Sequence, residues 1–280
     1  MSRLAYLACG ARAVRYSGIA TLVFFGGLLL LGGDVVAGPN SDPEAGKMEK
    51  RSLAEATKVL KQMDDAITRS KDLVMEFDMV VQDKDKAPRS YGMLVHTRGE
   101  DKRHTEFLYP GDVKGLKMLV LSRQQMYVYL PSFRKIRRIA THARAQSMFG
   151  SDYTYDEMST TTYSGIYQAT AMSESPTHYL VDVVRRPGQV APYARLQFRI
   201  VKAYQVPDRI VYFDESGKRL KTETRSKFVC PKKDICSADI MRMVDHTKND
   251  HWTEMRRKSL KIDTGFPETV FSLRRLQRGR

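Results

Sequence analysis

The sequence predicts a mainly β protein with one amphipathic helix near its N-terminal side. From residue 70 onward, apolar and polar side chains alternate in short runs, as they do in strands with one buried face. Only a few Gly, Pro, Asp or charged residues separate these runs, which is typical of an antiparallel meander. Apolar residues spaced three and four apart predict a helix over residues 49–69, with Ser41 or Asp42 as its weak cap.

The alternating runs number about ten or eleven by the period-two criterion. In the first of them, one face consists of Leu73, Met75, Phe77 and Met79. A curved sheet of this size, covered by a helix, forms either a half-open barrel or a sandwich. A half-open barrel would leave a concave apolar surface, which is a natural ligand site.

The first residues have the layout of a secretory signal peptide. Three arginines precede an uncharged stretch at residues 16–33, and a Val-Val-Ala segment follows it. We expect cleavage after Ala37, which leaves residues 38–280 as a single exported domain in the periplasm. The alternative is an uncleaved membrane anchor, because an uncharged stretch of this length is borderline for spanning a bilayer.

The chain is strongly basic. Residues 1–37 contain three Arg and one Asp, so their removal lowers the formal net charge from +15 to +13. A positive field of this size attracts anionic partners, although it can also serve solubility alone. In an exported protein those partners are lipid head groups or acidic protein surfaces, and nucleic acid is not expected.

A basic run at the end of one predicted strand has two interpretations. It consists of Arg134, Lys135, Arg137 and Arg138. The first interpretation is a solvated edge strand that its charges protect from pairing with other chains. The second is a docking patch for anionic head groups or for a protein partner.

The exported chain keeps two cysteines, Cys230 and Cys236. An even count at short spacing in an oxidising compartment predicts a disulfide. A metal site is not expected here, because the spacing is not C-x-x-C and no nearby His completes a four-ligand set.

The sequence contains no catalytic constellation on which an enzyme could be predicted. It has no G-x-S-x-G elbow, no P-loop and no G-x-G-x-x-G after a strand, so we expect neither catalysis nor a cofactor. Asp152, Asp156 and Glu157 form an acidic cluster within residues 150–157. Their spacing fits no calcium loop, which favours hydrogen bonds that order a loop over a Ca²⁺ site.

Residues 103–159 carry the motifs of a known family. They contain Phe-Leu-Tyr-Pro at 107–110, Tyr-Val-Tyr-Leu-Pro at 127–131 and, most specific of all, Gly-Ser-Asp-Tyr-Thr-Tyr-Asp at 150–156. Together with the later hairpin at 212–222, this order resembles the outer-membrane lipoprotein-sorting proteins, which are similar in fold to the lipoprotein carrier LolA. The resemblance implies a half-open antiparallel β-barrel with helices as a lid over an apolar cavity.

The resemblance implies a binding function, in one of two forms. The first is a periplasmic carrier for acyl chains of lipoproteins or for phospholipid, working between an inner-membrane exporter and an outer-membrane acceptor. The second is an accessory or regulatory module of a lipid exporter or a stress-sensing complex. A hydrolase is the least favoured hypothesis. As the cavity lining we expect apolar residues of the meander: Phe107, Leu119, Met126, Val128 and Phe149.

Overall fold

The structure is a computed structural model that describes residues 48–83 and 86–278. Its strands are β1 (Glu49–Arg51), β2 (Asp72–Gln82), β3 (Arg89–Arg98), β4 (Lys102–Tyr109), β5 (Lys117–Ser122), β6 (Gln125–Leu130), β7 (Lys135–Arg138), β8 (Tyr167–Glu174), β9 (His178–Arg185), β10 (Arg195–Val201), β11 (Val206–Phe213), β12 (Arg219–Lys232), β13 (Ile235–Asp245) and β14 (His251–Ile262). Its helices are α1 (Leu53–Ile67), α2 (Tyr155–Ser159), α3 (Leu273–Arg278) and the short 3-10 helices η1 (Pro131–Phe133), η2 (Thr141–Ala143) and η3 (Glu268–Phe271).

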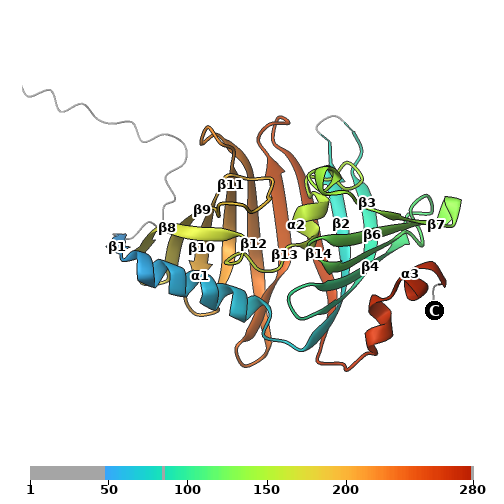
Figure 1. The fold of residues 1–280 in the computed structure, drawn as a ribbon, viewed down its shortest axis with the longest axis horizontal. Coiled ribbons are helices and arrows are strands. Elements are labelled where there is room, and N and C mark those ends of the chain that lie inside the picture. The colour runs from blue at the N-terminus through green and yellow to red at the C-terminus, as the bar shows by residue number, and fades with distance from the viewer. Residues whose placement is uncertain (1–47, 84–85, 279–280) are drawn as a thin grey trace, which may run out of the picture. The chain divides into compact units, whose positions relative to one another are not determined.

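The strands of the described part form one antiparallel sheet with two free ends. Their order is β1-β8-β9-β10-β11-β12-β13-β14-β2-β3-β4-β5-β6-β7. Two meanders, β2 to β7 and β8 to β14, therefore join where β14 pairs with β2. Figure 1 shows the sheet curving around α1 and α2, while α3 lies near β7. The predicted half-open antiparallel barrel is confirmed, and the sandwich alternative is not what forms.

The sheet has 14 strands in the described part, more than the sequence pattern suggested. One strand that the pattern missed is β8, in which the register shifts between Ala169 and Ala171. This irregularity places Met172, rather than Ala171, in the core, so the alternation of apolar residues is broken. The other missed strand, β1, has only three residues, all of them exposed.

Helix α1 begins later than predicted. Ser52 is its N-cap and forms a capping box: the Ser52 hydroxyl accepts a hydrogen bond from the Glu55 amide at 3.2 Å, and the Glu55 carboxylate accepts one from the Ser52 amide at 3.0 Å. The residues just before this cap pair with β8 as β1 instead of extending the helix. The predicted caps Ser41 and Asp42 lie outside the described residues.

The core has a large part on the concave face of the sheet and a smaller part on the other face. Ala56, Val59, Leu60 and Met63 of α1 pack into the large cluster. The small cluster consists of Leu119, Val270, Phe271 and Leu276, because the C-terminal segment covers β4 to β6 from outside. No helix within residues 48–83 and 86–278 is long and apolar enough to cross a membrane.

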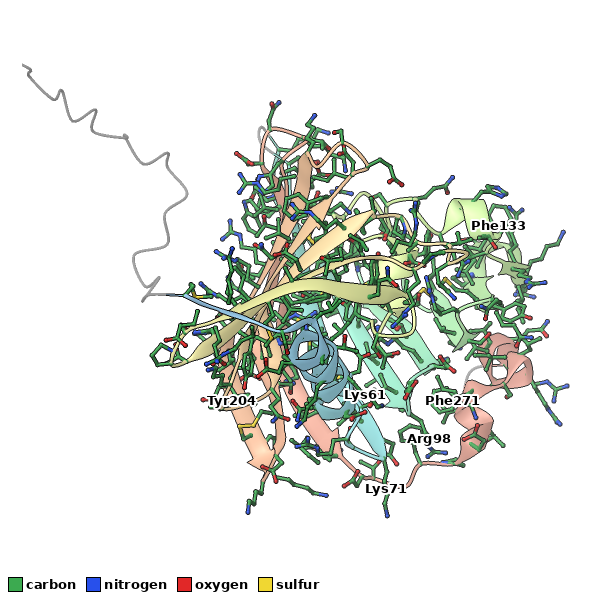
Figure 2. All side chains as sticks on the ribbon, turned by 60° about the vertical axis from the view of Figure 1, so that its left-hand side comes forward. Lys61, Lys71, Arg98, Phe133, Tyr204 and Phe271 are labelled. Atoms are coloured by element: carbon green, nitrogen blue, oxygen red, sulfur yellow. A yellow bond between two sulfur atoms is a disulfide. The ribbon has the colours of Figure 1, made fainter. Side chains whose placement is uncertain are left out.

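The C-terminal segment is held by charge as well as by packing. The guanidinium of Arg98 lies 4.6 Å from the ring centroid of Phe266, and it forms an ion pair with Glu268 at 2.8 Å. Figure 2 shows Arg98 close to Phe271 at this end of the molecule. The outer face of β3 and β4 is therefore partly covered, which distinguishes this sheet from one with a fully solvated outer face.

A candidate ligand cavity on the concave face

A cavity of about 220 Å³ lies between the two meanders. The strands β2 and β3 form one wall, and β11 to β14 form the other. The apolar lining is rich in methionine and includes Met75, Phe77, Met93, Val95, Met241 and Met255. Flexible, polarizable methionine side chains suit a surface that accepts apolar groups of variable shape.

One end of the cavity reaches the surface between the α1–β2 connection and the β12–β13 hairpin. Thr68 and Ser70 line this end from the connection, and Cys236 lines it from the hairpin. Gly99, in the turn between β3 and β4, also lines it and is exposed. The α1–β2 connection and the hairpin both lie at the lower edge of Figure 1. We call this end the opening.

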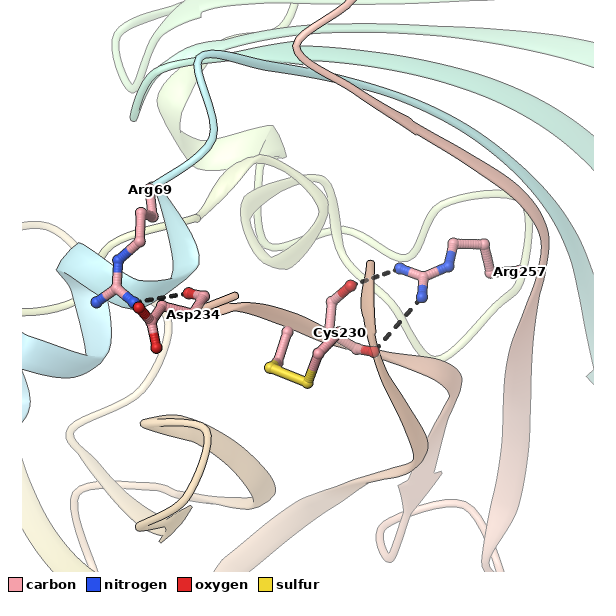
Figure 3. Close-up of a disulfide and its surroundings, with 6 residues drawn as sticks. Arg69, Cys230, Asp234 and Arg257 are labelled. Carbon is pink, nitrogen blue, oxygen red and sulfur yellow. Dashed lines mark hydrogen bonds between the residues drawn. A yellow bond between two sulfur atoms is a disulfide. The ribbon is translucent and has the colours of Figure 1, made fainter. Parts of the chain in front are cut away.

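Two arginines fasten the hairpin at the opening (Figure 3). Arg69 donates a 2.6 Å hydrogen bond to the carbonyl of Asp234 at the hairpin tip. Arg257 donates to the hydroxyl of Ser237 at 2.7 Å. Between them the Cys230–Cys236 disulfide closes the hairpin, as the sequence predicted.

Tyr153 and Glu157, from the segment that carries the family motif, line the cavity away from the opening. Asp152 lies within this segment and is buried; its carboxylate accepts a 2.8 Å hydrogen bond from the hydroxyl of Thr253. The same carboxylate lies 2.7 Å from Nδ1 of His251, whose Nε2 lies 2.6 Å from Asp83. The motif is thus anchored to β14 and to the end of β2.

The second half of the motif is anchored to β12 and to the connection that precedes β10. Thr154 caps α2 in a capping box with Glu157. The Glu157 carboxylate accepts a 2.6 Å hydrogen bond from the hydroxyl of Tyr193, and it forms an ion pair with Lys221 at 3.2 Å. The prediction that the acidic cluster orders the loop by hydrogen bonds is confirmed. Each carboxylate has a different set of partners, and no cluster of potential metal ligands occurs among the described residues.

Most charges that line the cavity are compensated by ion pairs. The pairs are Glu157 with Lys221 at 3.2 Å, Arg225 with Glu223 at 2.6 Å and Arg257 with Asp239 at 2.6 Å. Buried charges are tolerated when they are paired in this way.

Arg103 lines the cavity without such a partner. One of its nitrogens donates to the carbonyl of Met158, while its Nε is buried and has no hydrogen-bond partner. None of the ion pairs in the described part of the chain includes this residue. Burial lowers the pKa of Arg103 to about 10, so the guanidinium stays charged at neutral pH.

The five residues predicted to line the cavity lie elsewhere in the fold. Phe107, Met126, Val128 and Phe149 belong to the concave-face core, where the Phe107 and Phe149 rings meet edge-on at 4.9 Å. Leu119 faces the other side of the sheet and packs against the C-terminal segment. None of the five borders the 220 Å³ cavity described above. Their contact with lipid stays a prediction.

The basic run that the sequence singled out lies on the edge strand β7 and in the turn before it. Arg134, Lys135, Arg137 and Arg138 are all exposed, and the structure brings them together beside Phe133, whose exposed fraction is 64%. Figure 2 shows Phe133 at the end of the molecule opposite Tyr204. We call Phe133 and these four cations the basic edge.

Sequence reasoning missed the cavity residues of β13 and β14 and the unpaired Arg103. The alternation in β14 identifies Met255 as buried, but no periodicity shows that β14 pairs with β2, far away in the sequence. The isolated charge of Arg103 leaves no signal in the sequence, because the absence of a partner is a property of the fold.

Solved structures with the same architecture support the assignment of the fold. A domain from Vibrio parahaemolyticus described as outer membrane lipoprotein-sorting has a TM-score of 0.73 and 20% identity, over 81% of this chain and 100% of that one. A DUF1329 family protein from Desulfovibrio piger has a TM-score of 0.73 and 20% identity, over 80% and 98%. A LolA superfamily protein from Nitrosomonas europaea has a TM-score of 0.64 and 15% identity, over 78% and 97%.

The curved open sheet, the helix across its concave face and these likenesses define a protein with a LolA-like fold. A family model with the description "Uncharacterized protein" matches residues 99–278, and the chain belongs to that family. No curated protein matches the chain in sequence.

Proposed function

We propose that the protein is a periplasmic carrier that binds acyl chains of lipoproteins or other lipids in the concave-face cavity and moves them towards the outer membrane. The observation that carries the proposal is the cavity itself, which is apolar, rich in methionine and open at one end. Loading and release would exchange an acyl chain between two water-excluding sites, with no bond made or broken.

The energy available from such a site is adequate for reversible capture. Burying a methylene group is worth about 0.8 kcal/mol, so ten methylenes would supply roughly 8 kcal/mol before the costs of ordering. Micromolar binding corresponds to a free energy of this size. A carrier needs affinity in this range, because a much tighter site would not hand its cargo on.

The size of the cavity favours one acyl chain at a time. Pockets for drug-sized ligands usually occupy about 300–1,000 Å³, whereas this cavity has about 220 Å³. Cargo with several chains would need α1 to move away from β11 and β13, which it contacts. The hydrogen bond from Arg69 to Asp234 would break in such a movement, and it is exposed to solvent.

Export and delivery belong to the same proposal. Residues 1–37 would direct the chain, as a cleaved signal peptide, to the periplasm, where residues 38–280 act as one domain. The likeness in fold to the Vibrio parahaemolyticus domain described as outer membrane lipoprotein-sorting supports this role. The basic edge would then dock on anionic head groups at the donor or acceptor membrane.

A second candidate function is an accessory binding module that grips a protein partner. The basic edge favours it, because an exposed aromatic side chain among cations on an edge strand suits an acidic peptide. This module would use the basic edge without loading the cavity.

Native mass spectrometry of the exported protein, purified from a periplasm without detergent, tests the proposal. A carrier will retain phospholipid or acylated peptide in near-stoichiometric amount, and extraction will identify its class. A lipid-free mass that does not change when phospholipid or acylated peptide is added would contradict the carrier and leave the accessory module as the better account.

A further inference from the structure

We propose that the cavity takes an amphiphile with one acyl chain and an anionic head group, and that the guanidinium of Arg103 binds that head group. This inference rests on the proposed binding of acyl chains and names the class of ligand. The head group is a carboxylate or a phosphate monoester, since both accept two parallel hydrogen bonds from a guanidinium.

Arg103 has free capacity for such a ligand. A guanidinium has five N–H donors, and in this fold Arg103 uses one nitrogen on the carbonyl of Met158 while its Nε has no partner. Arg103 is half-buried, its Nε is cut off from solvent, and no carboxylate pairs with its charge; a partly desolvated cation of this kind gains from an anionic partner. An anion placed in the cavity beside Arg103 would provide the missing partner.

Among the charged residues that line the cavity, Arg103 is the one available to bind an anion, because the others are in ion pairs. Glu223 is neutralised by Arg225, and Asp239 is bound to Arg257. Glu157 is neutralised by Lys221. The two charges of each pair sum to zero, so the lining keeps one uncompensated positive charge, that of Arg103. A cation is repelled by that charge, and a neutral head group can accept a hydrogen bond from the guanidinium but gains no charge pairing.

The position of Arg103 sets the direction in which the ligand lies. Arg103 pairs across the strands with Thr97, which pairs with Leu73, and this row lies next to the exposed turn at the opening. The following rows lead inward along apolar side chains, first Met75 with Val95 and then Phe77 with Met93. A head group held at Arg103 therefore sits near solvent, while its chain extends towards the methionine-rich interior.

The test compares charged and neutral ligands with the same chain. The probes are oleate against oleyl alcohol, and oleoyl lysophosphatidic acid against mono-olein. Each is titrated, by tryptophan fluorescence or calorimetry, into the exported, delipidated protein and into the variants Arg103→Met and Arg103→Lys. Arg219→Met removes an exposed arginine outside the cavity lining and is the matched control. Thermal melts verify that each variant is folded.

Wild type and Arg219→Met are expected to bind each anionic probe about tenfold or more tightly than its neutral analogue. Arg103→Met is expected to bind all four probes with the affinity of the neutral ones, and Arg103→Lys to keep part of the preference. The tighter of the two anions identifies whether carboxylate or phosphate is the better head group.

Two results would overturn parts of the account separately. Equal affinity of wild type for charged and neutral probes, or a preference that survives in Arg103→Met, would refute the role of Arg103 while leaving acyl-chain binding intact. Failure of wild type to bind any of the four probes would refute the proposed function and this inference together.

Discussion

Acidification from pH 7 to pH 5 should weaken the fold through one buried histidine, His104. The two ring nitrogens of His104 have no hydrogen-bond partner, and the side chain is buried on the face covered by the C-terminal segment. Burial lowers the pKa of His104 to about 4 from its ordinary value of 6.5, with further lowering by His96, Lys117 and Arg275. Glu106, which also faces this space, does not offset these effects.

The sign and size of the effect follow from the two pKa values. Between pH 6.5 and 4 the unfolded chain binds a proton at His104 and the folded chain does not, so folding loses stability as the pH falls. The loss is about 1.4 kcal/mol per pH unit, or about 2 kcal/mol at pH 5. Above pH 6.5 the titration of His104 should no longer make stability depend on pH.

Urea denaturation at pH 7 and pH 5 measures the effect in wild type, His104→Leu and the control His142→Leu, which alters an exposed histidine. His104→Leu should be at least as stable as wild type at pH 7, because an apolar side chain replaces unsatisfied polar atoms. It should also lose about 2 kcal/mol less than wild type on acidification. An equal loss in wild type and His104→Leu would refute the reasoning, since other titrating groups are common to both.

Three further outcomes follow from the cavity, the disulfide and the basic edge. Ala238→Trp places a large ring at the opening and should reduce the lipid that co-purifies with the protein, whereas Val190→Trp, at an exposed site, should not. Replacing both cysteines of the β12–β13 hairpin by serine should lower the free energy of unfolding by about 2 kcal/mol in urea titrations, and no change would show that the arginine contacts alone hold the hairpin. Arg134→Glu combined with Arg137→Glu should weaken flotation with anionic vesicles, and this difference should vanish in high salt.

The architecture could be predicted from the sequence because most strands have one apolar face, and because most neighbours in the sheet are also consecutive in the sequence. The capping-box spacing of Ser52 and Glu55 is a signal for the observed cap of α1, but the predicted caps were instead Ser41 or Asp42, and the predicted helix began at residue 49. Strand β8 could not be predicted, because the register shift between Ala169 and Ala171 breaks the alternation of apolar residues on which the prediction depends.

The residues that line the cavity were harder to predict from the sequence than the fold, for two physical reasons. Both faces of β5 are covered, so alternation shows that Leu119 is buried without showing on which side of the sheet. The cavity also depends on the pairing of β14 with β2, which joins the two ends of the described sequence. The sequence also does not show whether a charge such as that of Arg103 has an ion-pair partner, because such partners lie on strands that are distant in the sequence.

Crosslinking with a photoreactive fatty acid, followed by peptide mapping, tests the central claim that the concave-face cavity binds an acyl chain. The account predicts labels on β2, β3, β13 and β14, with Met75, Met241 and Met255 among the labelled residues. Excess oleate should suppress these labels. Labels confined to the outer face around Leu119 and Val270, or labels that oleate does not displace, would contradict the account.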